Sequence, residues 1–257
     1  MTFCLGMKVD DGLVGIADTR VVSGSECITA RKVSVFEHGR SSLFVMTSGL
    51  RSLRDKIVTY FEEVLDKEES KFDRLYKAVN ALAEQVRRTA AEDQQALEAS
   101  RLGFNFQALV GGQLEHDKEH KLYLLYPQAN WVEVGPGTPY CIIGETGYGK
   151  PILDRTLKYN DSMHYALKVG CLAFDSTRIS AANVDFPIDV VAYKRDSFDL
   201  ICHRYEKQDL IEISNWWQER LRESVRLLPS GWLSAVVDDA ATRQSERTIP
   251  MSPGGAG

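Results

Sequence analysis

Residues 1–32 read MTFCLGMKVDDGLVGIADTRVVSGSECITARK, and the rest of the chain is organised around this stretch. It contains two apolar runs, residues 3–9 and 13–17, separated by Asp-Asp-Gly at positions 10–12. A glycine at the end of a three-residue loop favours the left-handed backbone that closes a β-hairpin. The stretch therefore predicts two antiparallel strands joined by a tight turn.

The pairing of these strands determines which side chains lie near Thr2. If Val9 faces Leu13, Arg20 lies opposite Thr2 and Asp18 lies one diagonal step away. Side chains alternate between the two faces of a strand, so both charged residues are then expected on the face of Thr2.

Thr2 carries the chemistry that such a cluster serves. Removal of Met1 leaves a hydroxyl and a free α-amine on one residue, which is a nucleophile with its own base. The reference pKa of an α-amine is about 7.7 to 8.0, close to the pH at which a general base works well. A third strand after Lys32 is expected to bring its ammonium to the same face, where it lowers the pKa of the amine. Asp18 is expected to hold that lysine in place.

Four residues and one strand end, in this order, resemble the catalytic β subunit of proteasome-type threonine peptidases. They are Thr2, Asp18, Arg20, Lys32 and the strand end Met46-Thr47-Ser48-Gly49, which precedes a predicted helix. Within that family the chain is most similar to Anbu, the bacterial ancestral β-subunit branch, over roughly residues 2–205. The resemblance implies an α+β fold, the αββα four-layer sandwich of N-terminal nucleophile hydrolases.

The resemblance also implies roles for individual residues. Thr2 is the expected nucleophile, and Asp18 and Lys32 are its expected charge-setting partners. The backbone N–H of Gly49 is the expected oxyanion donor, and Thr47 is expected beside the pocket for the substrate side chain. No cofactor and no metal ion are implied.

The supporting positions depart from the family pattern. A serine usually follows the glycine of a strand-to-helix loop, but Gly144 is followed here by Glu145 and Thr146. A serine is also usual three residues after a helical aspartate, but Arg178 occupies that position after Asp175. The residues expected to assist the reaction are Arg20, Thr146, Asp175 and Ser180, with Thr177 as an alternative to Ser180.

The function implied by the resemblance is that of a threonine-type endopeptidase acting on peptide or unfolded protein substrates. A homo-oligomer is also implied, as a ring or an open helical assembly, with an ATP-dependent unfoldase as a further expected partner. Two alternatives keep the same fold. One is an amide hydrolase acting on non-peptide substrates, and the other is a catalytically weak structural subunit of a self-assembling ring.

The composition is that of an ordinary globular protein. The 257 residues are 44% hydrophobic and 26% charged, with a formal net charge of -5 and a pI near 5.6. This acidic balance gives no electrostatic basis for binding nucleic acid or an anionic membrane. No apolar run reaches the ~18 residues that span a bilayer, and no signal-peptide pattern is present, so we expect a cytoplasmic protein. Five scattered cysteines without a C-x-x-C pair favour reduced core residues.

Hydrophobic periodicity predicts the remaining elements. Helices are expected at residues 53–64, 75–97, 150–158 and 162–174, and beyond residue 209. Strands are expected at residues 43–46, 104–110, 121–125, 140–143, 189–193 and 198–203, with a turn at Gly111-Gly112. This order favours two packed antiparallel sheets with helices outside them. We expect one domain, residues 1–237, followed by a disordered polar tail, residues 238–257.

Two motifs match other functions only in part. Residues 144–150 fit the first seven positions of a phosphate-binding P-loop, but Pro151 replaces the Ser or Thr that binds magnesium. His116 and His120 are four residues apart, in a charged stretch that is more typical of a solvated loop than of a metal site. We therefore predict neither a nucleotide site nor a metal site.

Overall fold

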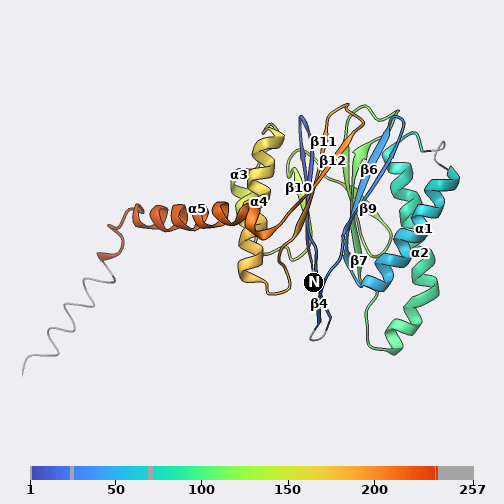
Figure 1. Cartoon of the computed structure of the whole chain (residues 1–257), viewed down its shortest axis with the longest axis horizontal. Coiled ribbons are helices and arrows are strands. Elements are labelled where there is room, and N and C mark those ends of the chain that lie inside the picture. Colours follow the sequence, from blue (N-terminus) through green and yellow to red (C-terminus); the bar gives the residue numbers. More distant parts are fainter. Residues whose placement is uncertain (1, 24–25, 69–71, 235, 237–257) are drawn as a thin grey trace, which may run out of the picture. The chain divides into compact units, whose positions relative to one another are not determined.

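The computed structural model describes residues 2–23, 26–68, 72–234 and 236. The chain divides into two compact units, Met1–Glu212 and Ile213–Gly257. Every site residue expected from the sequence belongs to the first unit (Figure 1).

One five-stranded sheet holds the predicted N-terminal hairpin, in the order β10-β1-β2-β11-β12. Its strands are β1 (Phe3–Val9), β2 (Gly12–Asp18), β10 (Tyr140–Gly144), β11 (Ile188–Lys194) and β12 (Leu200–Tyr205). All neighbouring strands are antiparallel. Every residue of β1 and β2 is buried, because both faces of this sheet are covered.

A second five-stranded antiparallel sheet has the order β5-β6-β7-β8-β9. Its strands are β5 (Val33–His38), β6 (Ser41–Gly49), β7 (Phe106–Gln113), β8 (Lys121–Leu125) and β9 (Trp131–Glu133). A short hairpin of β3 (Arg20–Ser23) and β4 (Glu26–Thr29) connects the two sheets along the chain.

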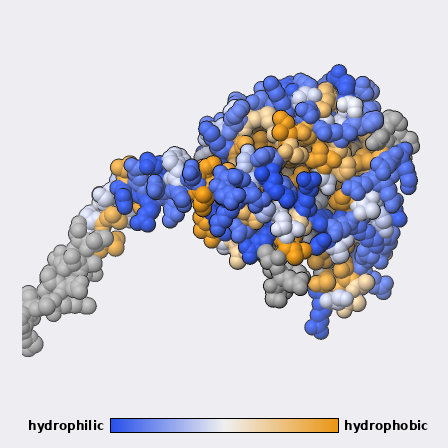
Figure 2. All heavy atoms as spheres, in the orientation of Figure 1, coloured by the Kyte–Doolittle hydropathy of each residue, from blue (hydrophilic) through white to orange (hydrophobic). Residues whose placement is uncertain are grey.

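Two pairs of helices cover the outer faces of the sheets (Figure 1). The helices are α1 (Arg51–Glu68), α2 (Leu75–Ala99), α3 (Lys150–Thr156) and α4 (Met163–Ser180). Helices α1 and α2 lie on the second sheet, and α4 packs on β1 and β2. The outer faces of α1 and α2 are mainly hydrophilic (Figure 2), which is the amphipathic pattern that the sequence predicts. The expected αββα sandwich is confirmed.

The space between the sheets is filled by side chains from both. A cluster of buried residues there includes Cys4 and Leu13 from the first sheet and Phe44, Met46 and Leu109 from the second. This layer holds the start of β1 against the end of β6, and both strand ends contribute to the candidate site.

The predicted register of the N-terminal hairpin is wrong by one residue. Val9 pairs with Gly12 rather than Leu13, and the loop contains only residues 10–11. A Cβ atom on Gly12 would lie 2.2 Å from the carbonyl oxygen of Tyr193 in β11, so this glycine is needed inside the sheet and not in the turn. Thr2 and Asp18 nevertheless lie at adjacent strand ends.

Gly111 and Gly112 also lie inside a strand, β7, and do not form the predicted turn. A Cβ atom on Gly111 would lie 2.3 Å from the ring of Phe44, and one on Gly112 would lie 2.1 Å from the carbonyl oxygen of Ser42. Close packing against β6, rather than a reversal of the chain, therefore explains the glycine pair.

Helix α5 (Lys207–Arg226) confirms the helix expected beyond residue 209, and the boundary between the two units falls within it. None of its described residues is buried, and its surface carries both hydrophilic and hydrophobic patches (Figure 2). The tail expected at residues 238–257 lies outside the described residues. In the described part of the chain, no helix is both long enough and apolar enough to cross a membrane.

Candidate active site

One carboxylate oxygen lies at the centre of the candidate site. Asp18 Oδ1 accepts hydrogen bonds from the hydroxyl of Thr2, the backbone N–H of Phe3 and the ammonium of Lys32, each at 2.7 Å. Lys32 Nζ also donates to the carbonyl oxygen of Arg20 at 2.7 Å. The structure thus brings together the three residues that the sequence singles out as nucleophile and charged partners.

The strand order explains this convergence. Thr2 precedes β1 and Asp18 ends β2, and these two strands are neighbours in the first sheet. Lys32 precedes β5 of the second sheet, where its carbonyl oxygen accepts from the N–H of Thr47 at 3.1 Å. The site therefore lies where the two sheets meet.

The ion pair between Lys32 and Asp18 is almost fully enclosed. Relative exposure is 0% for Asp18, 4% for Thr2 and 5% for Lys32. Burial raises the pKa of the Asp18 carboxyl above its ordinary value, and the charge of Lys32 opposes this shift. Because little of either side chain is exposed to solvent, the field of the lysine acts on the Thr2 hydroxyl with less screening than in water.

Cys4 is a second potential nucleophile, two residues beyond Thr2. Its Sγ atom lies 3.6 Å from the carbonyl oxygen of Thr47. Burial raises the pKa of the Cys4 thiol to about 12, so the reactive thiolate is scarce at neutral pH. The hydroxyl of Thr2 is therefore the better candidate.

Arg20 contributes to the cluster through its backbone. Its N–H donates to Asp18 Oδ2 at 3.2 Å, and its carbonyl oxygen accepts from Lys32. The guanidinium instead forms an ion pair with Asp185 at 3.1 Å.

The loop after β10 holds Thr2 from the other side, which the sequence analysis missed. The N–H of Glu145 donates to the carbonyl oxygen of Thr2 at 2.7 Å, and the Glu145 carboxylate accepts from Asn183 at 3.4 Å. Gly144 has a φ of 89°, and a Cβ atom there would lie 2.0 Å from the same carbonyl oxygen. A glycine at the end of a predicted strand is the signal that indicates such close contact.

Gly49, the expected oxyanion donor, lies at the exposed end of β6. Its φ is 127°, and a Cβ atom there would lie 2.0 Å from the carbonyl oxygen of Asn105. Only glycine fits this backbone conformation without strain.

A cavity of about 220 Å³ lies beside Lys32 and Thr47. It is lined by Arg31, Lys32, Ser34, Thr47, Arg54, Asp55, Val58 and Thr59. Thr47 was expected beside a substrate pocket, and the structure places it in this wall. Lys32 belongs to this wall and also contacts Asp18, so the cavity adjoins the candidate site.

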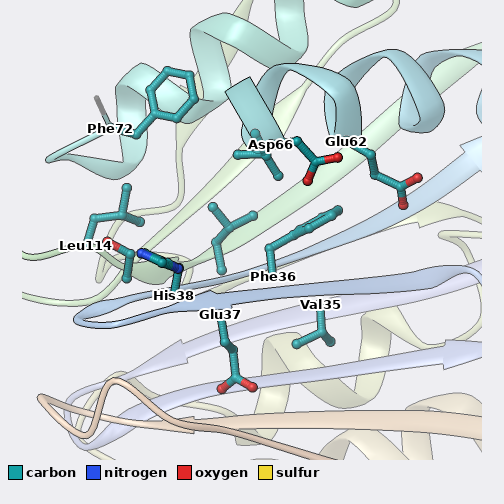
Figure 3. Close-up of a pocket in the computed structure, with 11 residues that line it drawn as sticks. Val35, Phe36, Glu37, His38, Glu62, Asp66, Phe72 and Leu114 are labelled. Atoms are coloured by element: carbon teal, nitrogen blue, oxygen red, sulfur yellow. The ribbon is translucent and has the colours of Figure 1, made fainter. Parts of the chain in front are cut away.

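A larger cavity of about 270 Å³ lies at the opposite end of β5 and β6, near His38 and Ser41 (Figure 3). Figure 3 shows Phe36 projecting from β5 toward α1, whereas Glu37 projects from the other side of the strand. Among the described residues that line this cavity, none belongs to the cluster around Asp18. Size alone therefore does not identify the site.

Three expected supporting residues do not join the cluster. Asp175 is paired with Arg178 at 2.7 Å, and Ser180 is exposed at the end of α4. Thr146 is exposed in the loop that follows Gly144. Within the described residues, none of the three forms a hydrogen bond with Thr2, Asp18 or Lys32.

The two histidines considered as a metal pair, His116 and His120, have different surroundings and different partners. His116 is exposed and contacts Asp73 at 3.3 Å, whereas His120 is buried with Nε2 2.8 Å from the carbonyl oxygen of Val9. No group of three or more candidate metal ligands is found among the described residues.

The sequence and the fold both match known proteins. The family model described as "Proteasome subunit" matches residues 2–185. Anbu (ancestral beta-subunit) from Yersinia bercovieri is 30% identical, with a TM-score of 0.81, over 88% of this chain and 97% of that chain. The structure titled "Helical Assembly of the Anbu Complex from Pseudomonas aeruginosa" is also 30% identical, with a TM-score of 0.81, over 89% of this chain and 97% of that chain.

A third similar structure is an Anbu (Gly-1) mutant from Hyphomicrobium sp. strain MC1. It is 28% identical, with a TM-score of 0.82, over 89% of this chain and 98% of that chain. No curated protein matches this chain.

Proposed function

Since the chain belongs to the proteasome family and to its Anbu branch, we propose that it is a threonine-type endopeptidase subunit that hydrolyses peptide bonds. The observation that carries this proposal is the placement of the Thr2 hydroxyl and the Lys32 ammonium on the same oxygen of Asp18, each at 2.7 Å. The proposal requires cleavage of the peptide bond before Thr2, by removal of Met1, to free the α-amine.

The reaction proceeds in two halves. Thr2 Oγ1 attacks the carbonyl carbon of the substrate while the α-amine accepts the hydroxyl proton. The resulting oxyanion accepts a hydrogen bond from the N–H of Gly49, and the ammonium of Lys32 stabilises the developing negative charge. The carbon–nitrogen bond then breaks, the leaving amine takes the proton from the α-ammonium, and an ester to Thr2 remains.

Water completes the cycle. The free α-amine accepts a proton from a water molecule, which attacks the ester carbon. Collapse of the second tetrahedral intermediate releases the carboxylic acid product and returns the proton to Thr2 Oγ1. All proton transfers involve groups of Thr2, so Asp18 and Lys32 remain charged throughout.

The proposal extends to the assembly. The Pseudomonas aeruginosa relative is titled as a helical assembly, which supports a homo-oligomer for this chain, in a ring or an open helix. Peptide or unfolded protein substrates, an ATP-dependent unfoldase partner, a bacterial source and a cytoplasmic location follow from the family resemblance and stay predictions.

A peptide epoxyketone tests the nucleophile directly, because this reagent bonds to both the hydroxyl and the α-amine of an N-terminal threonine. We expect intact-mass analysis to show loss of Met1 and one adduct per chain, which peptide mapping places on Thr2. The Thr2→Ala variant is expected to form no adduct. The Cys4→Ala variant serves as the control and is expected to react like wild type, since its hydroxyl and amine are unchanged.

Retention of Met1 together with absence of any adduct would refute the proposal and favour a structural subunit. An adduct on another residue would also refute it. Reaction with the epoxyketone but turnover only of small amides would favour the amide hydrolase instead.

A further inference from the structure

The cavity beside Thr47 has polar walls. Of its eight lining residues, only Val58 is apolar. Arg54, Asp55, Val58 and Thr59 line it from α1, at the three- and four-residue spacings that make side chains neighbours on a helix. The opposite wall is formed by the residues around Lys32 and Thr47.

Arg54 is the most enclosed charged residue on the helical side of this cavity. Its side chain is 15% exposed, against 51% for Asp55. Its Nε and Nη2 atoms donate to Asp55 Oδ1 at 2.9 Å and 2.6 Å, and Nη1 donates to the carbonyl oxygen of Arg31 at 3.1 Å. A guanidinium has five N–H donors, so two of them stay available in the described structure.

Lys32 adds one more donor. Its ammonium has three N–H groups, and two of them are used by Asp18 and by the carbonyl oxygen of Arg20. The one carboxylate in the cavity wall, that of Asp55, already accepts from Arg54 and lies 3.4 Å from Arg51 Nε. Among the charged side chains that line this cavity, free donors therefore exceed free acceptors.

The formal charges agree with this donor excess. Among the lining residues, Arg31, Lys32 and Arg54 carry three positive charges and Asp55 carries one negative charge. Asp18, which is paired with Lys32, adds a second negative charge. A basic substrate side chain meets like charge there, and an apolar side chain displaces water from polar groups that it cannot hydrogen-bond. An acidic side chain brings both the acceptors and the missing negative charge.

We infer that the preferred substrates carry a glutamate or aspartate immediately before the bond that is cleaved, and that Arg54 is the specificity-determining residue. This inference rests on the proposed peptidase function. Arg54 binds the substrate carboxylate through its free N–H groups, while Asp55 keeps the guanidinium plane in place.

The experiment uses two matched series that differ only in the residue before the reacting carbonyl, which is Glu, Gln, Leu or Lys. Fluorogenic peptides report turnover, and peptide epoxyketones report the rate of labelling of Thr2. We expect the glutamate member to exceed the leucine and lysine members by at least about tenfold in kcat/KM and in labelling rate. The glutamine member is expected to have values between those of the glutamate member and those of the leucine and lysine members.

The Arg54→Met variant is expected to lose this preference, mainly through an increase in KM for the glutamate peptide, with the leucine peptide little changed. Arg54→Lys is expected to keep part of the preference for glutamate, because lysine has the positive charge but lacks the planar guanidinium with its paired N–H donors. Arg51→Met is the matched control. Arg51 lies on the same helix and contacts the same Asp55 but does not line the cavity, so the preference is expected to stay.

A preference for leucine or lysine in wild type would overturn the inference while leaving the proposed function intact. An equal loss of kcat/KM for all four peptides in Arg54→Met would show that Arg54 only supports the segment before β5 through Arg31, and would also overturn the inference. Absence of Thr2 labelling by every epoxyketone would refute the proposed function, and this inference with it.

Discussion

At the scale of single residues, Asp18 is the group on which the geometry of the site depends. Its Oδ1 atom receives donors from the nucleophile candidate, from the backbone of Phe3 and from Lys32. A buried charge is costly unless it is paired and hydrogen-bonded, and here both conditions hold. The carboxylate therefore holds Lys32 near Thr2.

The raised pKa of Asp18 leads to a pH dependence of known sign. Burial raises the pKa of this carboxyl above 3.8, so the folded chain binds its proton more tightly than the unfolded chain between the two values. The contribution of Asp18 to the free energy of unfolding consequently decreases as pH rises through that interval and is constant above the raised pKa. We expect the unfolding free energy of wild type minus that of Asp18→Asn to decrease from about pH 4 upward, as measured by urea unfolding.

Asp73 provides a control of opposite sign. Its hydrogen bonds to Lys77 and His116 lower the pKa of its carboxyl to about 2. The stabilising contribution of Asp73 is therefore lost as pH falls below about 4. Above that pH, the unfolding free energy of wild type minus that of Asp73→Asn is expected to stay constant. If the unfolding free energy of wild type minus that of Asp18→Asn instead increased with pH, the pairing with Lys32 would outweigh the effect of burial on the pKa of Asp18.

At the scale of secondary structure, the site is built from strand ends and loops. The end of β2 supplies Asp18, the residue before β5 supplies Lys32, and the end of β10 contacts Thr2. The hydrogen bonds between strands hold these ends in a fixed register, which is how a rigid scaffold positions loop residues. The backbone at Gly144 is one of the closest approaches in this arrangement.

Gly144→Ala is expected to displace Thr2, because its methyl group would lie 2.0 Å from the Thr2 carbonyl oxygen and φ there is 89°. Epoxyketone labelling of Thr2 should slow by at least about 100-fold, since a displacement of about 1 Å has effects of that order. Gly147→Ala, in the same loop, is the control, because a Cβ atom there has no neighbour within 4 Å. Equal labelling rates in the two variants would show that β10 does not position Thr2.

At the scale of the whole molecule, the packing between the two sheets determines whether the site exists. Thr2 and Asp18 belong to one sheet and Lys32 to the chain entering the other, so separation of the sheets would break the ion pair. Phe44 lies in the inter-sheet layer with 0% exposure and fills the space opposite Gly111. Stability and the geometry of the candidate site thus depend on the same core.

Phe44→Ala is expected to destabilise the fold by about 3–5 kcal/mol, because it leaves a cavity where the sheets face each other. For a unit of this size the melting temperature is expected to fall by about 10 °C in a calorimetric scan. Phe72→Ala, at a half-buried position on the larger cavity, is the control and should have a smaller effect. Similar melting temperatures for the two variants would argue against a tightly packed inter-sheet layer.

Several features could be predicted from the sequence because their signals are local. Helical spacing in α1, α2 and α4, and strand patterns in β8 and β10, depend on neighbouring residues and agree with the structure. The order of Thr2, Asp18 and Lys32 was sufficient to indicate a cluster, even with the hairpin register wrong by one residue. Thr2 lies just before β1, and its hydroxyl reaches Asp18 Oδ1 at the adjacent strand end in the observed register.

Only the tertiary structure decided the register, the contacts of the loop after β10 and the charge of the cavity beside Thr47. The register depends on Gly12 meeting Tyr193, a residue about 180 positions away, and no local pattern contains that contact. Asp175 was expected near Thr2 but is paired with Arg178 on its own helix. The sequence determined which residues are candidates for the chemistry. Long-range packing decided which of them meet, because contacts between distant segments form only once the sheets and helices are assembled.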